Sequence, residues 1–209
     1  MKLNWANRIT ILRILLIVPF VSCMLKINDP SVSYTVQNSM RYFATIIFLV
    51  VAGSDVLDGY LARRKGQTTK LGSFLDPIAD KLLITCACLL LASQRAGVRG
   101  FSLPPTVVVV IIAKDLLLLI GFVIVYFITS KFYIAPVWVG KVLTLLQSSM
   151  VTAILLAPEF SVLLPGWLWF LRVLWWSAAT AAVLATLIYI RNGSRYIEQS
   201  EQGNSSRSS

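Results

Sequence analysis

Four aspartates in two short stretches are the residues best placed to do chemistry in this chain. Asp55 and Asp58 are three positions apart, and Asp76 and Asp80 are four apart, so on helices each pair shares one face. The flanking residues are apolar enough to be buried in a membrane, where ionised carboxylates are costly and indicate a functional site. Carboxylates crowded together must shift their pKa values or bind cations. Either a Mg²⁺ or Mn²⁺ pair or a proton-carrying site satisfies this requirement.

The residues around the aspartates complete a longer pattern. Gly59 and Gly72 lack a Cβ, which lets a ligand approach the backbone beside the acids. The pattern reads D-x2-D-G-x2-A-R-x8-G-x3-D-x3-D, and its fixed positions are Asp55, Asp58, Gly59, Ala62, Arg63, Gly72, Asp76 and Asp80. Eight fixed positions arise by chance on the order of once in 10⁹–10¹⁰ starts. This pattern resembles the signature of the CDP-alcohol phosphotransferase family.

The resemblance implies an enzyme that transfers a substituted phosphate from a CDP-linked donor to a hydroxyl group and releases CMP. It implies that Asp55, Asp58, Asp76 and Asp80 hold two Mg²⁺ or Mn²⁺ ions and that Asp80 is the catalytic base. The residues that it assigns to the CDP donor are Asp58, Gly59, Ala62, Arg63, Gly72 and Ser73. Family members are generally homodimers through their membrane helices, so the resemblance also implies a homodimer.

The surroundings of the motif indicate the two substrates. A site at bilayer depth with a cytoplasmic mouth suits a donor whose acyl chains stay in the lipid, as those of CDP-diacylglycerol do. The basic residues expected near the site favour an anionic acceptor over a cationic aminoalcohol; they are Lys70, Lys81, Lys114, Lys131 and Lys141.

Two further stretches resemble the subgroup that makes phosphatidylglycerol phosphate or cardiolipin. One is the run from Gly140 to Gln147, which is similar to G-K-x-x-T-x-x-Q, and the other is Ala113-Lys114-Asp115. The resemblance implies a glycerol-type acceptor, glycerol 3-phosphate or phosphatidylglycerol, bound by Lys114 and Lys141. Lys114 stands where the subgroup has Arg, and an ammonium cannot make the same bidentate contact. One alternative is an inositol phosphate or other polyol phosphate acceptor. The other is that Lys114-Asp115 forms an intramembrane ion pair with a neighbouring helix.

The composition is that of an all-α polytopic membrane protein. The chain is 57% hydrophobic and only 13% charged, with a mean hydropathy of +0.76, which is far less charge than a soluble domain carries. The net charge of +10 indicates cytoplasmic loops beside anionic lipid. No basic and aromatic module of the nucleic-acid-binding kind is present, so nucleic acid is not an expected partner.

Hydrophobic runs predict six transmembrane helices after a short interfacial segment at residues 1–8. The predicted spans are 9–27, 41–62, 72–93, 106–128, 140–157 and 167–190. Residues 1–190 are expected to form one transmembrane domain, and the polar residues 191–209 a disordered cytoplasmic tail.

Six spans place both termini on one side of the membrane. That side carries twelve of the nineteen Lys and Arg residues and the other side five, so the positive-inside bias puts the termini and the aspartate site in the cytoplasm.

A cation or proton transporter with an aspartate relay is the rival class. The chain shows no half-to-half repeat of the transporter kind.

Overall fold

The computed structural model describes residues 5–65, 70–129 and 138–205, and these residues are helical wherever they form regular structure. Within the helices, the side chains of residues 5–10, 55–65, 70–80, 122–129, 138–139, 141 and 193–205 lie outside the description. The helices are α1 (Trp5–Leu25), α2 (Tyr34–Lys65), α3 (Lys70–Ala92), α4 (Pro105–Thr129), α5 (Trp138–Leu155), α6 (Ala157–Leu163) and α7 (Trp167–Ser205). The all-α prediction is therefore confirmed.

Six long helices lie over the six predicted apolar ranges, but their bounds differ at several ends. α1 begins at Trp5 and so includes part of the predicted interfacial segment at residues 1–8. The second helix begins at Tyr34, where the sequence predicts a loop up to residue 40. A seventh helix, α6, occupies part of the predicted loop at 158–166. Pro158 stands in the first turn of α6, where its missing N–H removes no helical hydrogen bond.

The last helix extends beyond its predicted span. Residues 191–205 continue α7 to Ser205, where the sequence predicts a disordered tail from residue 191. Arg, Gln and Glu in this stretch are good helix formers. A stretch that prolongs an existing helix needs no new nucleus, so a polar tail can stay helical there.

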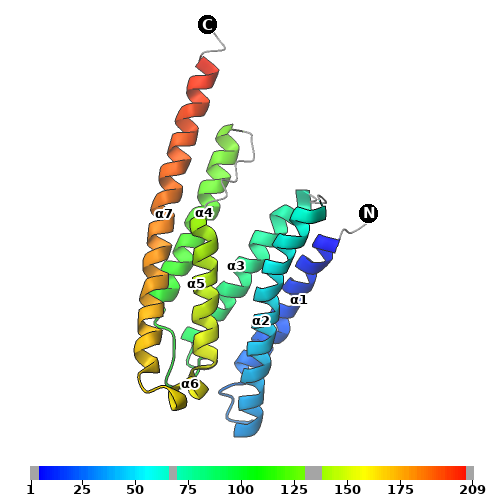
Figure 1. The fold of residues 1–209 in the computed structure, drawn as a ribbon, viewed down its shortest axis with the longest axis vertical. Coiled ribbons are helices and arrows are strands. Elements are labelled where there is room, and N and C mark those ends of the chain that lie inside the picture. The colour runs from blue at the N-terminus through cyan, green and yellow to red at the C-terminus, as the bar shows by residue number, and fades with distance from the viewer. Residues whose placement is uncertain (1–4, 66–69, 130–137, 206–209) are drawn as a thin grey trace.

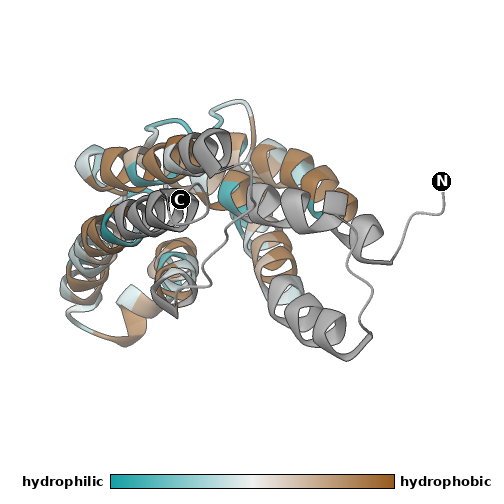
Figure 2. Ribbon diagram, turned by 90° about the horizontal axis from the view of Figure 1, so that it is seen from above, coloured by the Kyte–Doolittle hydropathy of each residue, from teal (hydrophilic) through white to brown (hydrophobic). Residues whose placement is uncertain are grey.

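Two helices of the described chain are long and apolar enough to cross a membrane, Tyr34–Ser54 and Trp167–Asn192. A third span results if the pair Val142–Leu155 and Ala157–Leu163, bent by 73°, is counted as one. The described parts of α1 and α3 are apolar but shorter. Seen from one end, most of the described helix length is hydrophobic (Figure 2). The helices thus suit an integral membrane protein, with two or three spans supported by length and composition.

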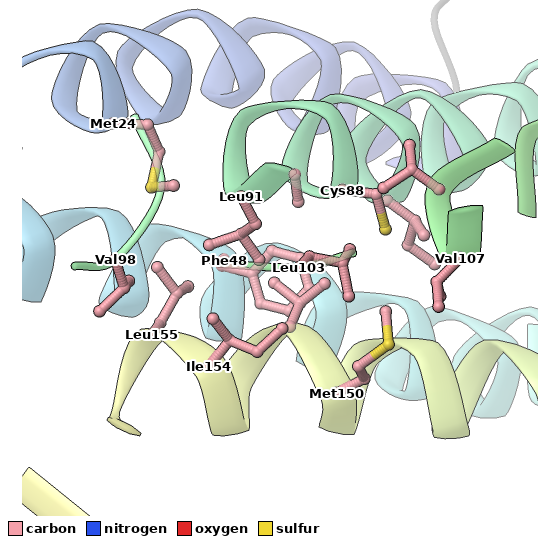
Figure 3. Close-up of a cluster of buried hydrophobic side chains, with 14 of the residues drawn as sticks. Met24, Phe48, Cys88, Leu91, Val98, Leu103, Val107, Met150, Ile154 and Leu155 are labelled. Atoms are coloured by element: carbon pink, nitrogen blue, oxygen red, sulfur yellow. The ribbon is translucent and has the colours of Figure 1, made fainter. Parts of the chain in front are cut away.

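The helices pack in two groups that share one core. α1 lies against α2 and α3, and α7 lies against α4 and α5, while α3 and α5 join the groups (Figure 1). The core between them contains Phe48 of α2, Leu91 of α3 and Ile154 of α5, all fully buried (Figure 3). Cys88 and Met150 extend it toward α4.

This packing brings distant parts of the chain to one end of the molecule. The C-terminal end of α2 and the N-terminal end of α3 lie at the same end as the start of α1 and the end of α7 (Figure 1). Both halves of the aspartate motif are therefore at the end that carries the two termini.

Candidate functional site

The two halves of the motif lie on neighbouring, antiparallel helices. The last turns of α2 carry Asp55, Asp58, Gly59, Ala62 and Arg63. The first turns of α3 carry Gly72, Ser73, Asp76 and Asp80. The side chains of these nine residues lie outside the described residues, so their grouping stays a prediction. The backbone places both acid pairs at adjoining helix ends (Figure 1), as a shared metal site requires.

The α2 half of the motif begins directly after a polar contact with α1. Arg13 of α1 is only 2% exposed, and its Nε donates a hydrogen bond to Oγ of Ser54 at 2.9 Å. Ser54 in turn donates to the carbonyl oxygen of Val51 at 2.8 Å. Because Ser54 immediately precedes Asp55, this contact ties the start of the motif to α1.

The α3 half of the motif ends directly before a second polar contact, made with α4. Lys81 follows Asp80, and its Nζ lies 2.5 Å from Oδ1 of Asp115. Nζ of Lys114 lies 2.8 Å from the same oxygen. Lys114 is 6% exposed, and a buried ammonium needs such a counter-charge. The sequence-based alternative of an ion pair at Lys114–Asp115 is therefore present, and Lys81 joins it from the neighbouring helix.

The polar face of α5 faces the protein interior. Gln147 is 2% exposed, and its Nε2 has no hydrogen-bond partner among the described residues. Thr144, one turn earlier, donates its hydroxyl to the carbonyl oxygen of Gly140 at 3.0 Å. The side chain of Lys141, the second predicted acceptor residue, lies outside the described residues. Gln147 and Thr144 thus mark the polar, inward-facing side of α5.

The described side chains contain no cluster of three or more Asp, Glu, Cys or His residues that could hold a metal. The proposed metal site therefore depends on the four motif aspartates. Carboxylates at i, i+3 and i, i+4 spacing on adjoining helix ends match the oxygen ligands that Mg²⁺ and Mn²⁺ prefer.

Comparison with known proteins identifies the family of the chain. The family model described as CDP-alcohol phosphatidyltransferase matches residues 3–190. The chain belongs to the CDP-alcohol phosphatidyltransferase family. The matched range includes both halves of the aspartate motif and the Lys81–Lys114–Asp115 cluster.

Several curated relatives carry the name CDP-diacylglycerol–glycerol-3-phosphate 3-phosphatidyltransferase. The Pseudomonas fluorescens protein is 40% identical over 107 residues, which cover 51% of this chain and 50% of that protein. The Yersinia enterocolitica protein is 32% identical over 162 residues, or 78% of this chain and 82% of that protein. The Haemophilus influenzae protein is 38% identical over 95 residues, 46% of each chain. The chain thus spans about half the length of some of these relatives and most of others.

Sequence reasoning missed two contacts that border the motif. It did not pair Ser54 with Arg13, and it treated Lys81 only as part of a basic surrounding. Both contacts had a local signal, because Ser54 and Lys81 are the immediate neighbours of Asp55 and Asp80. The partners could not be found locally, since they lie 41 and 34 residues away in the chain.

Proposed function

We propose that this protein is a phosphatidyltransferase that moves the phosphatidyl group from CDP-diacylglycerol to glycerol 3-phosphate and releases CMP. The observation that carries the proposal is the complete eight-position motif on the adjoining ends of α2 and α3, inside the range matched by the family model. The names of the relatives favour glycerol 3-phosphate over phosphatidylglycerol or a polyol phosphate as acceptor.

Asp55, Asp58, Asp76 and Asp80 are the residues that would hold two Mg²⁺ or Mn²⁺ ions. Ions held by these carboxylates would neutralise the diphosphate and favour in-line displacement at phosphorus. Asp80 accepts the proton of the acceptor hydroxyl. The hydroxyl oxygen then forms a bond to the phosphorus attached to diacylglycerol, and the bond from that phosphorus to the CMP oxygen breaks.

The remaining motif residues position the donor. Arg63 has the planar fork that matches a phosphate. Gly59 and Gly72 allow the nucleotide to approach the backbone, and Ala62 and Ser73 complete the pocket. Positioning and charge stabilisation supply most of the rate in phosphoryl transfer, so these contacts are part of the catalytic machinery.

In the membrane, we propose six spans with both termini and the aspartate site on the cytoplasmic side, and a homodimer. The charge bias of the sequence supports this orientation, and the common location of the motif and the chain ends fits it (Figure 1). Lys114 and Lys141 are proposed to bind the phosphate of the acceptor.

The test is CMP release from CDP-diacylglycerol by the purified protein in mixed micelles, with Mg²⁺ or Mn²⁺. Radiolabelled glycerol 3-phosphate, phosphatidylglycerol and inositol phosphate are supplied in turn, and the lipid product is identified. We expect label from glycerol 3-phosphate in phosphatidylglycerol phosphate. No CMP release with any acceptor would refute the proposal. Ion flux in proteoliposomes that is lost in Asp80→Asn would then favour a transporter with an aspartate relay.

A further inference from the structure

The Lys81–Lys114–Asp115 cluster is built around a single carboxylate oxygen. Oδ1 of Asp115 accepts from Nζ of Lys81 at 2.5 Å and lies 2.8 Å from Nζ of Lys114. The two ammonium nitrogens are therefore no more than about 5.3 Å apart, the sum of these distances. Two like charges repel strongly at such a separation in a protein interior, so Asp115 is what allows them to be neighbours.

The cluster is larger than ion pairing alone requires. One lysine would neutralise Asp115, but two are present, and the described cluster carries a net charge of +1. Lys114 is buried, whereas the Lys81 side chain is 41% exposed. A positive charge that is kept partly accessible inside an apolar bundle is expected to serve an anion.

The position of the cluster identifies which anion it can meet. Lys81 follows Asp80 directly, so the two Cα atoms are about 3.8 Å apart. Asp80 is the residue that we propose to deprotonate the acceptor hydroxyl. Consecutive residues leave a helix about 100° apart, so an acceptor that has its hydroxyl at Asp80 must extend around α3 for its anionic group to meet the two lysines.

We propose that Asp115 is a positioning residue that holds Lys81 and Lys114 side by side as a two-cation site for the phosphate monoester of the acceptor. This inference rests on the proposed function and deepens it. A phosphate monoester is a dianion near neutral pH and gains more from two adjacent ammonium groups than the singly charged phosphodiester of phosphatidylglycerol. The cluster thus favours glycerol 3-phosphate on physical grounds.

The experiment compares Asp115→Asn and Asp115→Glu with the wild-type protein, and measures KM for glycerol 3-phosphate and for CDP-diacylglycerol separately. Asp115→Asn leaves the two cations without their shared partner. We expect the KM for glycerol 3-phosphate to rise about tenfold or more, since a hydrogen bond to a charged group is lost. The KM for CDP-diacylglycerol should stay within about twofold, and Asp115→Glu should recover most of the loss.

Glu159→Gln is the matched control, because it breaks a different buried ion pair, that with Arg41, at the other end of the bundle. If both ion pairs are merely structural, the two variants should behave alike. Lys81→Gln removes one cation but keeps the Lys114–Asp115 pair, and a smaller rise in KM is expected from it. An unchanged KM for glycerol 3-phosphate in Asp115→Asn, or an equal rise in Glu159→Gln, would overturn the inference.

Direct binding separates this inference from the proposed function. Binding of glycerol 3-phosphate is measured by calorimetry on wild-type and Asp115→Asn protein, whether or not either turns over. Weaker binding by the variant supports the two-cation site even if no CMP is released, in which case only the proposed function fails. Equal binding by both proteins, or no binding by the wild-type protein, contradicts the site.

Discussion

The ion pair between Arg41 and Glu159 provides a quantitative test of the packing, because it joins α2 to α6 far from the motif. The buried guanidinium of Arg41 donates Nη1 to the carbonyl oxygen of Leu155 and to Oε2 of Glu159, each at 2.7 Å. Its Nη2 donates to Oδ1 of Asn38 at 2.5 Å and to Oε1 of Glu159. Tyr42 adds a hydroxyl hydrogen bond to Glu159 at 2.6 Å. Glu159 is thus the only acid in the described part of the chain that neutralises Arg41.

Glu159→Gln keeps the shape of the side chain and removes its charge. Breaking a fully buried pair costs about 3–5 kcal/mol. The Glu159 side chain is 33% exposed, and water therefore screens part of the interaction. Leu155 and Asn38 also remain as acceptors for Arg41. We expect a loss of about 2 kcal/mol in the free energy of unfolding, which corresponds to a fall in Tm of roughly 4–8 °C for a chain of this size.

The assay is thermal unfolding in one detergent, followed by tryptophan fluorescence. Arg172→Gln is the control, since the Arg172 guanidinium lies 5.1 Å from the ring centroid of Trp169 at an exposed position and should contribute less than about 1 kcal/mol. A Glu159→Gln variant that melts with the wild-type protein would show that the buried pair does not hold α2 to α6. Equal losses in the two variants would show that charge at any position has the same effect.

Three further outcomes follow from the proposed site and from the fold. Asp80→Asn should abolish CMP release while CDP-diacylglycerol binding is partly kept, because the variant lacks the base but keeps most of the donor contacts; a near-normal rate would contradict its role. Asp58→Ala should lose both Mn²⁺ binding and donor binding, which is checked by paramagnetic resonance of Mn²⁺. Chelation by EDTA should stop CMP release in the wild-type protein until Mg²⁺ or Mn²⁺ is restored, which is checked by measuring activity in parallel. Gly97→Ala should lower Tm, because an added Cβ would meet the carbonyl oxygens of Ser93 at 2.7 Å and Leu91 at 2.9 Å. Gly53→Ala is the control, because nothing lies within 4 Å of the added atom there. Equal melting of the two variants would contradict the close backbone approach at Gly97.

The helices were predictable where the signal is a long apolar run, and less so at their ends. Hydrophobic runs place six helices in the right ranges, because a long apolar run bounded by polar and Pro-containing stretches is typical of a buried helix. The start of α2 and the short helix α6 are not predictable in this way, since residues 34–40 are mostly polar and residues 157–163 contain Pro158, and both features are equally typical of loops. The extension of α7 is not predictable from composition, because a polar stretch is typical of disorder, while Arg, Gln and Glu in the same stretch also favour a helix.

The candidate site was predictable to the extent that its pattern is local. Spacings of three and four residues within α2 and α3 identify the aspartate motif without any knowledge of packing. The partner of Asp115 cannot be predicted from a local pattern, because several lysines in the sequence are able to neutralise this carboxylate. Only the packing of α3 against α4 selects Lys81, at 2.5 Å.

The described ion pairs also bear on how the motif aspartates are neutralised. Asp115 and Glu159 are the acids within the described helical side chains, and each contacts a cation from another helix. An acid in an apolar bundle is thus accompanied by positive charge, as the cost of burying a carboxylate requires. Lys81, the cation next to Asp80 in the chain, shares Asp115 with Lys114, and one cation cannot neutralise four carboxylates. Four motif carboxylates need about four positive charges, and two divalent ions supply that number, which supports the proposed metal pair over neutralisation by side chains alone.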